Sequence, residues 1–346
     1  MSHFNPTIDK YLSGRHVKLK SLDYYVNGIK EAKDDFILSE AITLLESQVS
    51  EHRQLAEEIL RVCYDSENDT RRVGITGPPG VGKSTFIENM GAHIIQNGKS
   101  LAVLTIDPSS ARHGGSILGD KTRMNILAEH PGVFVRPSPS SGNLGGLHER
   151  TYEAMLLCEA AGKDFIMIET VGVGQSEFDI EHIADCVILL MQPYSGDQLQ
   201  WIKRGITEIA DLIIVHKADG ERLNEAKRLK VEIVKTMGIV ENDAWNPPVL
   251  TYSSVEKGKE GSVLDEIDHF FDYLSENHLI NTMRKANAIH WLKNQIVNKF
   301  VPLLEKELLH LPEIEKYMVK IEDGERTPFQ ILPELVNQIE LSVKFK

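Results

Sequence analysis

The chain has 346 residues, of which 41% are hydrophobic and 26% charged, the composition of a globular protein with one large domain or two moderate ones. Its formal net charge of −13, without a long basic block, argues against nucleic acid or an anionic membrane as a main partner. The 3 cysteines are dispersed, the N-terminal residues do not resemble a targeting signal, and no apolar run approaches the length of a membrane span. We therefore expect a cytoplasmic protein with reduced thiols.

Residues 20–65 predict amphipathic helices. Their apolar residues recur at helical intervals and are Ile42, Leu45, Val49, Leu55, Ile59 and Val62. Ser39 is the expected N-cap of this region. We assign residues 1–70 to an N-terminal helical extension.

Residues 71–273 predict an α/β domain. Seven short apolar runs alternate with amphipathic segments; they are "RVGIT", "SLAVLTID", "GVFVRP", "DFIMIET", "DCVILLMQ", "DLIIVHK" and "PPVLTYS". This alternation is typical of a mostly parallel central sheet flanked by helices on both faces. In such folds the ligand lies in the loops that follow the strands.

A phosphate-binding loop follows the first of these strands. The stretch "GPPGVGKST" matches the P-loop pattern G-x-x-x-x-G-K-[ST], in which backbone N–H groups surround phosphate oxygens. Lys83 is expected to reach the β- and γ-phosphates, and the Ser84 hydroxyl to bind Mg²⁺. The nucleotide-binding residues expected here are Gly77, Pro78, Pro79, Gly80, Val81, Gly82, Lys83, Ser84 and Thr85. The fold class is therefore a P-loop NTPase.

Three carboxylates are candidates for the surroundings of the metal ion. Glu169 ends an apolar strand, and Gly172 follows three residues later, as do the metal-binding carboxylate and the γ-phosphate-binding glycine of other nucleotide hydrolases. Asp107 ends another strand, and Asp120 lies in a glycine-rich loop. Val173 stands directly after Gly172, where a small GTPase carries the glutamine that orients water, so we expect slow intrinsic hydrolysis.

The loop "HKAD" after the sixth strand is the candidate base site. The carboxylate of Asp219 can accept hydrogen bonds from N1–H and the exocyclic amine of guanine, donors that adenine lacks on that edge. The stem of Lys217 can cover one face of the purine. His216 stands where guanine-nucleotide enzymes usually have Asn, and its ring N–H could donate to N7. Ser253 lies in "TYSS", a further candidate for contact with the base.

Residues 274–346 predict a C-terminal helical extension. A stripe of apolar residues runs along it at helical spacing: Ile289, Leu292, Ile296, Phe300, Leu303 and Leu308. Pro302 within this run predicts a kink or a helix restart. By itself the stripe fits either packing on the rest of the chain or association with a second copy.

Together these motifs resemble the MeaB/ArgK-type GTPases, the group associated with methylmalonyl-CoA mutase, over about residues 20–300. The stretches "GITGPPGVGKST", "TIDPSS", "GGSILGDKTRM", "ETVGVGQSE" and "GDQLQWIKRGITEIADLIIVHKADG" carry the resemblance. It implies a GTPase of the SIMIBI class that binds GTP or GDP with Mg²⁺, forms a homodimer through its C-terminal helices, and acts as a chaperone of an adenosylcobalamin-dependent acyl-CoA mutase. The chaperone would gate cofactor loading and protect or reactivate the mutase.

By the same resemblance, Lys83, Asp107, Asp120 and Glu169 are the expected catalytic residues. Ser84, Asp107, Asp120 and Glu169 are the expected metal-site residues. Residues 192–203 resemble a switch segment that couples the nucleotide to the mutase, although "QLQW" departs from the family's glycine after "ELQ".

Three other functions fit parts of the sequence. A nickel metallochaperone GTPase shares the architecture but needs a cluster of thiols or imidazoles, whereas the 13 histidines are dispersed. An ArgK-type ATPase or kinase linked to amino-acid transport would need an acceptor pocket with a general base. A nucleotide-binding scaffold without hydrolysis would be compatible with His216 and Val173.

Overall fold

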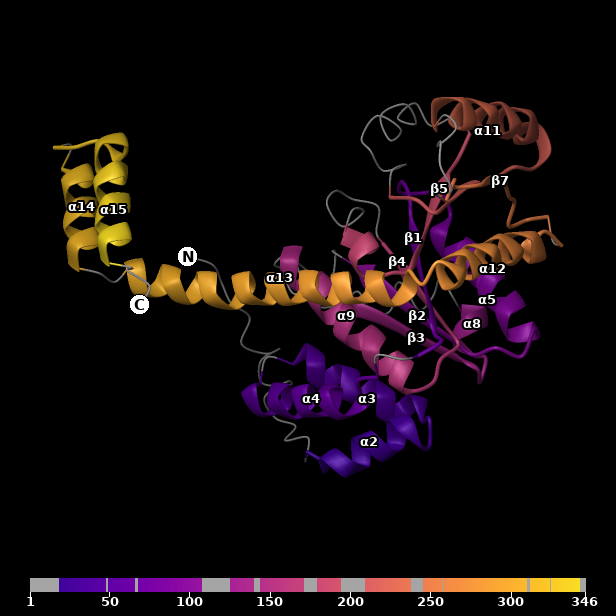
Figure 1. Ribbon diagram of the computed structural model, residues 1–346, viewed down its shortest axis with the longest axis horizontal. Helices are drawn as coiled ribbons and strands as arrows, with labels where there is room; N and C mark the ends of the chain where they lie inside the picture. Colours follow the sequence, from indigo (N-terminus) through magenta and orange to yellow (C-terminus); the bar gives the residue numbers. More distant parts are fainter. Residues whose placement is uncertain are drawn as a thin grey trace. The chain divides into compact units, whose positions relative to one another are not determined.

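The computed structural model places a parallel sheet between layers of helices (Figure 1). It describes residues 19–47, 49–65, 68–107, 125–139, 144–170, 179–193, 209–237, 245–256, 258–309, 312–323 and 325–342. The described part divides into two compact units, residues 1–288 and 289–346. The predicted domain boundaries at residues 70 and 273 stay a prediction.

The sheet has seven strands in the order β3-β2-β4-β1-β5-β6-β7, and every pairing is parallel. The strands are β1 (Arg71–Thr76), β2 (Leu101–Asp107), β3 (Val133–Pro139), β4 (Phe165–Glu169), β5 (Cys186–Met191), β6 (Leu212–Val215) and β7 (Val249–Thr251). All seven predicted strands are thereby confirmed. Because parallel strands end at one edge, the loops after β1, β4, β6 and β7 share that edge.

Helices cover both faces of this sheet. One core is formed by alternate strand residues with the apolar sides of α5 (Lys83–Gln96), α8 (Asn125–Ala128) and α12 (Glu260–Glu276). A second core joins β5, β6 and β7 to α11 (Leu223–Met237). The helix α9 (Leu144–Ala160) contacts β2, β3 and β4. Two short 3-10 turns are η2 (Asp179–His182) and η4 (Gly220–Arg222).

The N-terminal helices pack on α9. They are α2 (Leu22–Lys30), α3 (Asp35–Glu46) and α4 (Ser50–Cys63), and Figure 1 shows α3 and α4 below α9. The Arg53 guanidinium of α4 donates to both carboxylate oxygens of Glu153 in α9, at 2.8 and 2.5 Å. The helices are confirmed, but the Ser39 cap is wrong: the Asp34 carboxylate caps α3 by accepting from Phe36 N–H at 2.8 Å.

The C-terminal region is helical, as predicted. Its helices are α13 (Ile280–Leu309), α14 (Pro312–Glu322) and α15 (Pro328–Ser342), and α13 continues through Pro302 without the predicted restart. Within the first unit, Arg284 of α13 donates to the buried carboxylate of Asp185 at 2.6 Å and to Thr70 O at 2.6 Å. None of the helices that the structure describes is long and apolar enough to cross a membrane.

Asp211, at the start of β6, gives the fold a testable pH dependence. Its carboxylate accepts from Val187 N–H at 2.8 Å, yet burial, with the nearby charges of Asp185 and Glu181, raises the pKa of Asp211 to about 7. The folded state therefore favours the neutral acid, and the stability that it contributes is fully present below the ordinary pKa of 3.8 and is lost as pH rises from there to about 7.

Asp211→Asn should accordingly be more stable than the wild type at pH 8, by at least about 1 kcal/mol, and nearly equal to it at pH 4, close to the ordinary pKa of 3.8. Denaturant unfolding at the two pH values measures the difference. Asp323→Asn, at an exposed position, serves as the matched control. A stability difference between Asp211→Asn and the wild type that does not increase from pH 4 to pH 8 would contradict the assignment.

Candidate functional site

The loop between β1 and α5 has the backbone geometry of a phosphate cradle. Gly77 has φ 143°, and a Cβ there would lie 2.4 Å from Leu190 O; Gly82 has φ 103° and directly precedes α5. Both positions favour glycine because other residues rarely adopt these angles. The start of α5 directs its free N–H groups toward this loop, an arrangement suited to an anion.

Three side chains form hydrogen bonds to carbonyl groups of this loop. The Lys83 ammonium, in a side chain only 6% exposed, donates to Gly77 O at 2.7 Å and Pro78 O at 3.3 Å. Lys217 donates to Gly80 O at 2.5 Å, and a ring nitrogen of His216 lies 2.6 Å from Val81 O. With these carbonyls held by donors, the loop can direct N–H groups toward a ligand.

The predicted metal-site residues converge only in part within the described residues. The Ser84 hydroxyl donates to the Glu169 carboxylate at 2.9 Å, which joins the start of α5 to the end of β4. Asp107 is the last residue of β2. Two residues before it, Thr105 pairs with Glu169 of the neighbouring strand β4. A hydroxyl beside a carboxylate is a donor set of hard oxygens, which suits Mg²⁺. Asp120, Gly172 and Val173 lie outside the described residues.

The base loop after β6 is fixed to the loop after β7. The Ser253 hydroxyl donates to the Asp219 carboxylate at 2.5 Å and accepts from the N–H groups of Val255 and Glu256, at 3.2 and 3.4 Å. These bonds hold the Asp219 carboxylate in place while leaving its other oxygen for further donors. Lys217 has φ 57°, and its ammonium also donates to Gln192 Oε1 at 2.8 Å.

The ring nitrogens of His216 contact protein atoms, whereas the sequence predicted a contact with N7 of guanine. Its side chain is buried, with Nδ1 2.6 Å from Val81 O and Nε2 2.8 Å from Ser254 Oγ. Both ring nitrogens therefore have protein partners. Burial, aided by the charge of Lys217, lowers the pKa of His216 despite the bond to Val81 and the charge of Asp219. The imidazole is thus neutral at neutral pH.

Sequence analysis placed Gln192 in the switch segment and Ser254 within "TYSS", but it did not predict that Gln192 contacts Lys217 or that Ser254 contacts His216. Gln192 follows the carboxyl end of β5, and Ser254 follows that of β7. Both strands pair with β6, which carries "HKAD". That position was the available signal, since loops at this edge meet around the ligand.

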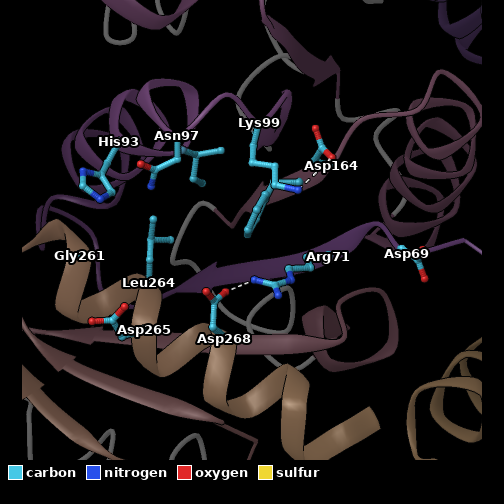
Figure 2. A pocket seen from close by; sticks show the side chains of 12 residues that line it. Asp69, Arg71, His93, Asn97, Lys99, Asp164, Gly261, Leu264, Asp265 and Asp268 are labelled. Atoms are coloured by element: carbon cyan, nitrogen blue, oxygen red, sulfur yellow. Dashed lines mark hydrogen bonds and ion pairs between the residues drawn. The ribbon is translucent and has the colours of Figure 1, made fainter.

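A separate pocket of about 520 Å³ lies at the other end of the strands (Figure 2). Arg71 begins β1 and Phe165 begins β4, so this pocket is at the opposite edge of the sheet from the phosphate loop. Arg71 forms an ion pair with Asp268 of α12, and the Lys99 ammonium lies 3.7 Å from the Asp164 carboxylate. Because both cations have carboxylate partners and the phosphate loop is distant, we do not assign the nucleotide to this pocket.

The fold and site define a P-loop GTPase, and comparison with known proteins agrees. The family described as "Methylmalonyl Co-A mutase-associated GTPase MeaB" matches residues 38–307. The chain belongs to this family.

Relatives cover most of the chain. A probable GTPase of Mycobacterium tuberculosis is 45% identical over 260 residues, 75% of this chain and 77% of that protein. GTPase ArgK of Escherichia coli is 43% identical over 260 residues, with 75% and 78% covered. The mitochondrial methylmalonic aciduria type A homolog of Mus musculus is 39% identical over 297 residues, with 79% and 72% covered.

A solved structure supports the fold class. The crystal structure of an LAO/AO transport system kinase matches with a TM-score of 0.74 and 30% identity, covering 93% of this chain and 100% of that one. The predicted fold class and the predicted GTPase activity are therefore confirmed, whereas the roles of the individual site residues stay predictions.

Asp219 provides a direct test of the base site. Asp219→Asn should weaken GDP binding about 100-fold and favour xanthosine diphosphate, because Asn offers an N–H donor to the carbonyl that xanthine has in place of the guanine amine. Calorimetric titration with the two nucleotides measures both effects, and Asp323→Asn is the control. Unchanged GDP affinity in Asp219→Asn would show that this carboxylate does not face the base.

Proposed function

We propose that this protein is a G-protein chaperone that gates cofactor loading of an adenosylcobalamin-dependent acyl-CoA mutase of the methylmalonyl-CoA type, and protects or reactivates it. Membership in a mutase-associated GTPase family is the observation that carries the proposal. The mitochondrial relatives named for methylmalonic aciduria support it. The three cysteines are unpaired and buried, which fits a reducing compartment such as the cytoplasm.

Mg²⁺ is the proposed metal ion of the reaction. Ser84 and Glu169 would hold it, with Asp107 and Asp120 as further acidic residues, and it would neutralise charge on the transferred phosphoryl group. Lys83, Gly172 and the rest of the phosphate loop would position the triphosphate. Lys217, Asp219 and Ser253 would bind or support the guanine, and His216 would support the pocket.

The competing functions have less support. A nickel chaperone needs several soft or imidazole ligands together, and no group of three or more His, Cys, Asp or Glu suited to a metal occurs in the part of the chain that the structure describes. The solved relative is called a transport system kinase, but the relatives at 45% and 43% identity are called GTPases. Neither alternative has a feature of the described site that favours it over the mutase chaperone.

The partnership can be tested with the full chain and purified methylmalonyl-CoA mutase. We expect a complex in gel filtration whose affinity differs between GDP and a non-hydrolysable GTP analogue, and GTP hydrolysis at least about fivefold faster with the mutase. Lys83→Ala, which removes the phosphate-binding ammonium, is the control for nucleotide dependence. Absence of a complex in both nucleotide states, with unchanged hydrolysis, would contradict the proposal. Transfer of phosphate to a small acceptor would favour the kinase.

A homodimer formed through the C-terminal helices is the second part of the proposal. The apolar stripe of α13 is about half exposed at every described position; its residues and exposures are Ile289 54%, Leu292 52%, Ile296 49%, Phe300 58% and Leu303 59%. An apolar face of this extent is typical of a surface that associates with another protein. A second copy of the chain is the occupant that the family resemblance implies.

Phe300→Glu with Leu303→Glu should convert the dimer to a monomer, because two charges would be buried at the contact. Sedimentation equilibrium at micromolar concentration measures the mass. Asn298→Glu, on the opposite side of the same helix by its spacing, should leave the dimer intact. A monomeric wild-type protein would refute the dimer.

A further inference from the structure

The imidazole of His216 bridges two loops of the nucleotide site. Nδ1 lies 2.6 Å from Val81 O in the phosphate loop, and Nε2 lies 2.8 Å from Ser254 Oγ in the loop after β7. The backbone N–H of His216 donates to Met191 O at 2.6 Å, which extends the pairing of β5 with β6. One residue therefore joins three segments: the phosphate loop, the end of β5 and the loop after β7.

The partners determine where the ring proton lies. A carbonyl oxygen can only accept, so Nδ1 must carry hydrogen and donate to Val81 O. In the neutral ring Nε2 is then an acceptor, and the Ser254 hydroxyl donates to it. Burial favours this neutral form by lowering the pKa of His216.

Packing fixes the plane of the ring. The imidazole stacks on Tyr252, with ring centroids 5.8 Å apart and an interplanar angle of 13°, and meets the edge of Phe86 at 6.3 Å. It also occupies the space beside Gly82, where a Cβ would lie 2.6 Å from Cε1 of the ring. With 2% of the residue exposed, no part of the ring is available for a base.

From these contacts we propose that His216 is a positioning residue for guanine-nucleotide binding, acting through the Val81 carbonyl and not through contact with the base. The bond to Val81 O holds the phosphate loop in the conformation in which its N–H groups face the ligand. It simultaneously sets the distance between that loop and the segment that carries Lys217 and Asp219. The proposal concerns nucleotide binding by the chain alone, so it stands or falls independently of the mutase partnership.

Two substitutions distinguish the roles of the two ring nitrogens of His216. The amide nitrogen of Asn can take the place of Nδ1, whereas that of Gln can take the place of Nε2. His216→Asn therefore keeps the donor to Val81 O, and His216→Gln loses it. Both variants lose the stacking on Tyr252, so the pair is matched for the loss of packing.

Calorimetric titration of the full chain with GDP should show His216→Asn within about threefold of the wild type and His216→Gln weaker by about tenfold or more, since the latter leaves a buried carbonyl without its donor. Thermal unfolding checks that both variants fold. If His216→Gln does not fold, His216→Asn alone decides, because a tenfold loss in it overturns the proposal. Equal losses in the two variants, or none in either, also overturn it.

A second nucleotide separates positioning from direct contact. 7-Deaza-GDP lacks the N7 acceptor. If His216 donated to N7, the wild type would bind 7-deaza-GDP more weakly than GDP. The ratio of the two Kd values would then fall to about one in His216→Gln. The proposal predicts the same ratio in the wild type and in His216→Gln. A ratio that collapses in the variant would show that His216 touches the base and would overturn the proposal.

Discussion

The phosphate loop can bind an anion only if its N–H groups converge, and convergence turns its carbonyl groups outward. A buried outward carbonyl then needs a donor, because leaving it unpaired costs about 1–3 kcal/mol. In this protein the donors come from Lys83, Lys217 and His216. Two of the three belong to the base loop, so the phosphate and base sites hold each other in place.

The strand order makes this mutual support feasible. β1 carries the phosphate loop and pairs with β5, which in turn pairs with β6 and its base loop. The second core, with α11, fixes β5, β6 and β7 to one another, and the first core anchors Val81 and α5 beneath the loop. The two loops are therefore joined through packed, paired strands. Gln192, which accepts from Lys217 at the end of β5, brings the start of the next segment into the same set of contacts.

Local sequence patterns predicted those features that local physics determines. Short apolar runs identified all seven strands, and the glycine spacing identified the phosphate loop, because burial on both faces and positive φ angles leave direct traces in the sequence. The Ser39 cap failed for a local reason as well: Asp34 offers a carboxylate to the first turn, so α3 begins earlier, and Ser39 falls inside it. Pro302 was expected to kink the helix or to restart it; the restart is wrong, because α13 continues through Pro302, and the kink stays a prediction.

Local sequence patterns could not predict the contacts of His216. Sequence analysis compared His216 with the usual Asn and proposed that its ring N–H could donate to N7, because "HKAD" is the candidate base loop. The partners of its two nitrogens, Val81 and Ser254, lie far away in the chain and are brought together only by the sheet. Likewise, the pairing of Ser253 with Asp219 depends on the adjacency of β6 and β7, which no single segment encodes.

Titration of the nucleotide-free wild-type protein with GDP and, separately, with ADP, each with Mg²⁺, tests the central claim most directly. We predict micromolar or tighter binding of GDP and no measurable binding of ADP, because Asp219 would be left with an unpaired charge against adenine. Equal affinity for the two nucleotides, or a preference for ADP, would contradict the claim that the base loop, with His216 in place of Asn, is still a guanine site.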